Sequence, residues 1–74
     1  MRRLAINTRR LRGGAALSQE RLAELVGCAT TYVQRVEAGA ANPTMSFIAA
    51  LAYGLGADPS ELLLPPQDPG ESAD

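Results

Sequence analysis

Seventy-four residues make one small domain with a modest core, and a hydrophobic content of 46% with only three aromatics favours packed helices over a sheet. One cysteine and no histidine exclude an internal disulfide and leave neither a zinc ligand set nor an evident nucleophile–base pair, so no enzyme activity or cofactor is expected. The chain has no apolar run of membrane-spanning length and no signal-peptide pattern, which predicts a soluble cytoplasmic protein.

The net charge of −1 hides a polarised distribution. Residues 1–44 carry all seven arginines against three acids, a net charge of +4, whereas residues 45–74 carry five acids and no base, a net charge of −5. A chain that is basic at one end can still meet a polyanion such as nucleic acid, although its total charge is close to zero.

The chain opens with a predicted helix over residues 1–12, which Gly13-Gly14 ends. Leu4, Thr8 and Leu11 share one face of it, and arginines cover much of the rest. Those arginines are either a solvated face or contacts to an anionic partner.

The next helix is predicted between Ser18 and Gly27. The Ser18 hydroxyl is a good N-cap, and Leu22, Leu25 and Val26 follow at the i, i+3, i+4 spacing of an inward-facing stripe. Gly27 supplies a sharp turn.

A third helix is predicted from residue 29 or 30 to residue 38, with Gly39 as its stop. Val33 and Val36 point to the core. Polar side chains at i, i+4 spacing form two neighbouring rows on the exposed face: Thr30, Thr31, Gln34 and Arg35.

Thr44 is a second N-cap, and the helix predicted over 45–55 is almost wholly apolar, closed by Gly54 and Gly56. Its expected core side chains are Met45, Phe47, Ile48, Leu51, Ala52 and Leu55. Asp58, with Pro next and a Glu at the third helical position, then opens a short helix through residue 64. Residues 65–74 are expected to form a disordered acidic tail.

The segments LSQERLAELVG, TTYVQRVEAG, NPT and ALAYGLGADPSELL together resemble the lambda repressor/Cro-like helix-turn-helix domain of the XRE family, over about residues 4–64. The resemblance implies an all-α, compact five-helix DNA-binding domain over residues 1–64, with the third helix in the major groove of double-stranded DNA. The small size is also similar to that of restriction–modification controller proteins.

The resemblance also assigns roles to single residues. It implies base reading by Thr30, Thr31, Gln34 and Arg35, and a structural brace between Arg12 and Glu37. Their chemistry is suitable, because Arg can pair with guanine, Gln with adenine and a Thr methyl with thymine. The candidate phosphate contacts are Gln19, Ser18, Arg12, Asn42 and Thr44.

Some positions depart from the family pattern. Ala29 stands where a Ser or Thr N-cap is usual. In the alternative, Thr30 or Thr31 caps the helix, and that threonine is then not available to contact bases. Ala16 replaces a common glycine, and Ala40-Ala41 lack the basic residues often found there, which predicts fewer phosphate contacts.

The predicted function is a transcriptional regulator that binds a near-palindromic operator as a homodimer, acting as a repressor or an activator. The expected dimer surface comprises Phe47, Tyr53, Leu63 and Leu64, unless these side chains only close the core. The alternative is a protein-interaction module, such as an antitoxin or adaptor, whose acidic carboxy-terminal third binds a protein partner.

Overall fold

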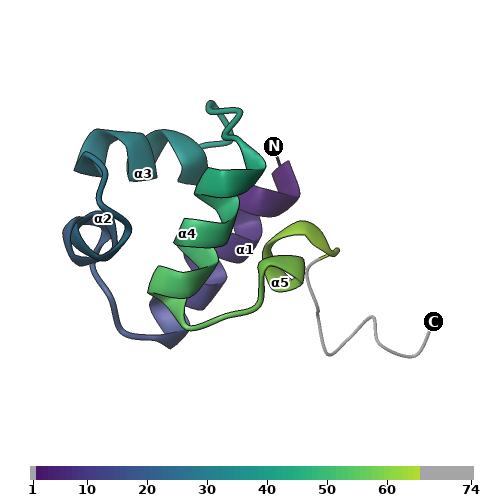
Figure 1. The fold of residues 1–74 in the computed structure, drawn as a ribbon, viewed down its shortest axis with the longest axis horizontal. Helices are drawn as coiled ribbons and strands as arrows, with labels where there is room; N and C mark the ends of the chain where they lie inside the picture. The colour runs from purple at the N-terminus through teal and green to yellow at the C-terminus, as the bar shows by residue number, and fades with distance from the viewer. Residues whose placement is uncertain (1, 66–74) are drawn as a thin grey trace.

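The computed structural model describes residues 2–65, and these residues form five helices (Figure 1). The helices are α1 (Arg2–Gly14), α2 (Gln19–Val26), α3 (Thr30–Glu37), α4 (Met45–Leu55) and α5 (Pro59–Leu63). This confirms the expected all-α, five-helix domain. None of the helices in the described part of the chain is long and apolar enough to cross a membrane. Of the acidic tail expected over residues 65–74, residues 66–74 lie outside the described residues.

Local cap signals explain where three helices begin. The Ser18 hydroxyl accepts from the Arg21 amide, and the Thr44 hydroxyl accepts from the Phe47 amide at 3.1 Å. Asp58 begins α5 with a complete capping box, because the Glu61 carboxylate also accepts from the Asp58 amide at 2.8 Å. These starts are the ones that the sequence predicts.

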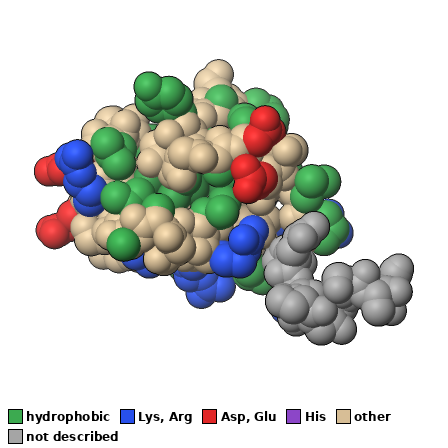
Figure 2. All heavy atoms as spheres, turned by 90° about the horizontal axis from the view of Figure 1, so that it is seen from below, with side chains coloured by type: hydrophobic (Ala, Val, Ile, Leu, Met, Phe, Trp, Pro, Cys, Tyr) green, Lys and Arg blue, Asp and Glu red, His purple; other side chains and the backbone are tan. Residues whose placement is uncertain are grey.

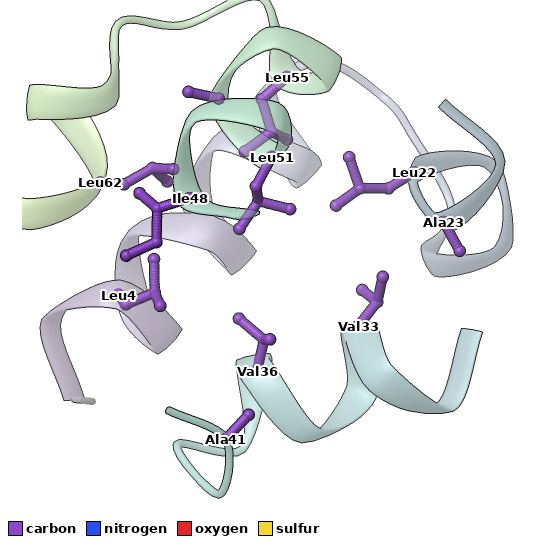
Figure 3. Close-up of a cluster of buried hydrophobic side chains, with 11 residues drawn as sticks. Leu4, Leu22, Ala23, Val33, Val36, Ala41, Ile48, Leu51, Leu55 and Leu62 are labelled. Atoms are coloured by element: carbon purple, nitrogen blue, oxygen red, sulfur yellow. The ribbon is translucent and has the colours of Figure 1, made fainter. Parts of the chain in front are cut away.

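The core is a cluster of aliphatic side chains from all five helices and from the connection between α3 and α4 (Figure 3). Its members are Leu4, Leu22, Ala23, Val33, Val36, Ala41, Ile48, Leu51, Ala52, Leu55 and Leu62. Two residues expected inside are exposed instead: Leu25 keeps 43% of its surface and Met45 keeps 64%. Both predictions were wrong because the neighbouring helices cover only the central part of each apolar stripe.

Glycines account for two differences at helix ends. Helix α1 continues through Gly14 instead of stopping at residue 12, and Gly54 lies inside α4. Gly56, with a φ of +69°, is the residue that ends α4. A Cβ on Gly54 would come within 3.1 Å of a Val26 methyl, so the bare backbone lets α4 approach α2 closely.

Two buried polar side chains lie on α1, and the burial of one of them, Asn7, was not predicted. The Asn7 side-chain amide is fully buried and donates to the carbonyls of Leu62 and Leu64, each at 2.9 Å. It therefore joins α1 to the end of α5. Thr8 occupies the predicted core position, and its buried hydroxyl has no hydrogen-bond partner within the described residues.

Candidate nucleic-acid interface

Three residues connect α2 to α3. Gly27 ends α2 with a φ of +86°, and its amide and that of Cys28 both donate to the Ala23 carbonyl. Ala29 then begins α3 in an extended conformation. In Figure 1, α2 is seen nearly end-on while α3 lies across the view, so the connection is a sharp helix-turn-helix. Burial raises the pKa of the Cys28 thiol, in agreement with a packing role.

Helix α3 presents a polar outer face. Thr31, Gln34 and Arg35 are exposed and Thr30 is half-buried, while Val33 and Val36 are buried on the opposite side. Among residues 2–65, the Arg35 guanidinium takes part in no ion pair. The outer face of α3 thus offers donors, acceptors and methyl groups to a ligand.

The start of α3 has no side-chain cap. Ala29 is the N-cap residue, and no side chain accepts a hydrogen bond there. The alternative in which Thr30 or Thr31 caps the helix is therefore wrong. Both threonines lie in the first turn of the helix, so both remain candidates for base reading.

The other end of α3 is held by a cluster that we call the brace, comprising Arg12, Gln19 and Glu37. Arg12 Nε donates to Glu37 Oε2 at 2.6 Å and Arg12 Nη2 to Glu37 Oε1 at 3.1 Å, which is a bidentate ion pair. The Gln19 amide also donates to Glu37 Oε1, at 2.9 Å. The Glu37 side chain is only 4% exposed, and the hydrogen bond to its carboxylate raises the pKa of Arg12. The brace therefore links α1, the start of α2 and the end of α3.

The brace limits two of the predicted phosphate contacts. Arg12 also donates from Nη1 to the Leu17 carbonyl at 3.0 Å, so its guanidinium is largely engaged within the protein. The Gln19 amide gives one of its two N–H groups to Glu37 and keeps the other. The Gln19–Glu37 hydrogen bond was not predicted, because nothing in the local sequence marks it.

The remaining predicted phosphate residues lie on the segments beside the carboxy-terminal end of α3. Ser18 sits beside Gln19 at the start of α2, whereas Asn42 and Thr44 follow α3. All three of these residues are exposed to solvent. The hydroxyls of Ser18 and Thr44 also accept the hydrogen bonds that cap α2 and α4. Each capping hydroxyl accepts a hydrogen bond and still has its own O–H to donate.

The four predicted dimer residues fall into two groups. Tyr53 is 84% exposed and Leu64 is 58% exposed. Phe47 and Leu63 are half-buried against the core, and the Phe47 ring meets the Tyr32 ring edge-on with centroids 4.9 Å apart. Only Tyr53 and Leu64 thus offer large apolar surface to another molecule.

Charged side chains are unevenly distributed over the surface. In Figure 2, which views the molecule from below, basic side chains lie along the lower edge and also beside the acidic side chains at the left end, and further acidic side chains lie at the upper right. No group of three or more potential metal ligands occurs among residues 2–65.

Comparison with known proteins decides the family. A family model described as a helix-turn-helix domain matches residues 3–64. The chain belongs to the helix-turn-helix domain family. A curated relative, the Neisseria hypothetical transcription factor of Neisseria meningitidis, is 43% identical over 65 residues, which are 88% of this chain and 61% of the relative. The chain thus spans less than two thirds of that relative's length.

Solved structures of the same family agree with the fold. The crystal structure of that Neisseria factor superposes with a TM-score of 0.85 at 42% identity, covering 89% of this chain and 76% of the other. The crystal structure of the restriction–modification controller protein C.AhdI from Aeromonas hydrophila superposes with a TM-score of 0.79 at 39% identity, covering 82% of this chain and 92% of the other. These likenesses confirm the resemblance to lambda repressor/Cro-like regulators.

Proposed function

We propose that this chain is a cytoplasmic, sequence-specific DNA-binding regulator of transcription, with α3 as the recognition helix in the major groove. The observation that carries the proposal is the outer face of α3. Thr31, Gln34 and Arg35 project together from a helix that is fixed to the core by Val33 and Val36. A helix fits the major groove, and these side chains match the hydrogen-bonding edges of bases.

The names of the relatives support the same role. One is called a transcription factor, and the other is called a restriction–modification controller protein. In this proposal Thr30 completes the base-reading face, and Ser18, Gln19, Asn42 and Thr44 position the domain on the DNA backbone. Arg12 serves mainly as a structural residue, because the brace and the Leu17 carbonyl engage its guanidinium.

The functional unit is proposed to be a homodimer on a near-palindromic operator. Tyr53 and Leu64 supply exposed apolar surface for it, and Phe47 and Leu63 are half-buried members of the predicted surface. Two copies would read half-sites separated by about 34 Å, or one turn of DNA. Sedimentation of Tyr53→Ser and Leu64→Ser should show loss of the dimer, whereas Met45→Ser, at an exposed apolar residue outside the predicted surface, should not.

Selection of bound sites from a random DNA pool tests the DNA-binding function. The wild type should enrich a symmetric motif, and Arg35→Ala should relax the preference at one position by about 1–3 kcal/mol of discrimination. Arg3→Ala removes the same charge from α1 and should enrich the unchanged motif. Failure to enrich any motif would refute the proposal and favour the protein-interaction module.

A further inference from the structure

A hollow of about 400 Å³ lies between α1 and the end of α3. Arg2 and Arg9 of α1 line one side of it, and Ala38 and Gly39, directly after α3, line the other. The two arginines are seven residues apart, which places them on the same face of α1 two turns from each other. Two arginines thus line one hollow.

Nothing within the described residues uses the charge of these two arginines. Neither forms an ion pair with another residue between 2 and 65. The carbonyls of Gln34, Arg35 and Val36 in the last turn of α3 already accept hydrogen bonds from backbone amides. The donors are the amides of Ala38, Gly39 and Ala40, at 2.9–3.1 Å. A role of Arg2 and Arg9 in capping α3 is therefore not required.

The acid at the hollow is already neutralised. Glu37 lines the hollow, but its carboxylate accepts hydrogen bonds from Arg12 and Gln19 and is almost fully buried. The remaining charge at the rim is that of Arg2 and Arg9, and it is positive. Such a rim favours an anion, and arginine is well suited to phosphate.

The hollow borders the proposed DNA surface. Gly39 leads directly into the segment with Asn42 and Thr44, and in Figure 1 the amino-terminal end of α1 lies beside this segment. That segment carries no basic residue, since Ala40 and Ala41 occupy the positions where one is expected. Arg2 and Arg9 of α1 therefore lie close to the connection between α3 and α4, which itself has no positively charged side chain.

We infer that Arg2 and Arg9 bind phosphate groups of the operator backbone beside the carboxy-terminal end of α3. The inference rests on the proposed DNA-binding function and adds two contacts from α1 to it. The contacts are to phosphate, so they strengthen binding to any DNA sequence and carry no base preference.

The salt dependence of DNA binding by the full chain tests this inference. Each neutralised phosphate contributes about 0.9 to the slope of log affinity against log salt concentration. Arg2→Ala and Arg9→Ala should each reduce the slope by about 0.9, which corresponds to about an eightfold loss of affinity at 0.1 M salt. The loss should be equal on the selected operator and on unrelated DNA.

Arg3→Ala is the matched control. Arg3 shares a face with Arg10, which borders a different hollow with Glu61 and Leu64 of the α5 region. The control variant removes one positive charge from the same helix, and its slope should stay at the wild-type value. Equal slopes for all three variants would overturn the inference, because general electrostatics would then explain any loss.

A second measurement locates the contact. Uncharged methylphosphonate linkages are placed one at a time along the operator, and the affinities of wild type and Arg9→Ala are compared. At the contacted phosphate the wild type should lose about eightfold and Arg9→Ala should lose nothing. Additive losses at every position would overturn the inference. Failure of the proposed function looks different, because the wild type would then prefer no DNA sequence at all.

Discussion

The brace offers the sharpest test of how the fold is held, through the substitution Glu37→Gln. The Glu37 carboxylate accepts three hydrogen bonds, two from Arg12 at 2.6 and 3.1 Å and one from Gln19 at 2.9 Å. Glutamine has the same shape but only one carbonyl oxygen, and its NH2 group would face an N–H donor of Arg12. The variant thus keeps the volume of the side chain and removes the charge and one acceptor.

The expected cost follows from burial. Removing one partner of a fully buried ion pair costs about 3–5 kcal/mol. Arg12 is 22% exposed and keeps its bond to the Leu17 carbonyl, so water can partly replace the lost acceptor. We therefore expect Glu37→Gln to lower the free energy of unfolding by about 2–3 kcal/mol. In a domain of this size that corresponds to a fall in Tm of about 10–20 °C.

Thermal and urea denaturation followed by circular dichroism would measure the loss. The matched control is Glu24→Gln, which breaks the exposed Arg21–Glu24 pair of similar length, 3.0 Å, and should cost under about 0.5 kcal/mol. Replacing both Arg12 and Glu37 by methionine should cost less than Glu37→Gln alone, because no charge is then left unpaired. If Glu37→Gln is as mild as Glu24→Gln, the brace does not stabilise the fold and the reasoning fails.

Three further predictions concern the connections and caps. Ala16 has a φ of +57°, so Ala16→Gly should raise the free energy of unfolding by about 0.5–1 kcal/mol in urea titrations. Ala29→Ser should supply the missing cap of α3 and raise Tm by an amount equivalent to about 1 kcal/mol. Hydrogen bonds from the backbone and side chain of Ser60 hold the pKa of Asp58 below its usual value, so the stabilisation is present above the unfolded pKa and is lost as pH falls through the folded pKa. On acidification the Tm of the wild type should therefore fall relative to the Tm of Asp58→Asn. If the difference between the two Tm values does not change with pH, the Ser60 hydrogen bonds to Asp58 do not stabilise the fold.

The parts of the fold that could be predicted from the sequence are those encoded locally. Ser18, Thr44 and Asp58 each begin a helix, because a capping side chain acts on amides two or three residues away. The bounds of α4 were likewise predicted from the Thr44 cap and the glycines at its end. Leu25 and Met45 were misplaced because periodicity identifies the centre of an apolar stripe, while its covered width depends on neighbouring helices.

Features that depend on distant partners could not be predicted in this way. Gly54 looked like a helix terminator, but it is a packing residue whose partner, Val26, lies on α2. Asn7 donates to Leu62 across 55 positions of sequence, and no local rule specifies that pairing. The Arg12–Glu37 pairing came from family resemblance, because spacing alone does not indicate an ion pair between residues 25 positions apart.

The two ends of α3 are held by different means, which matters for the proposed reading of DNA by this helix. Its start lacks a side-chain cap, whereas its end is fixed through Glu37 to both α1 and the start of α2. The orientation of α3 relative to α2 therefore depends on the brace as well as on the packing of Val33 and Val36. In the proposed function, one N–H of Gln19 binds Glu37 and its second N–H binds a DNA phosphate, so the same amide connects the DNA backbone to α3. If α3 is the reading helix and Gln19 is the phosphate contact proposed above, a change at Gln19 should alter both affinity and base preference.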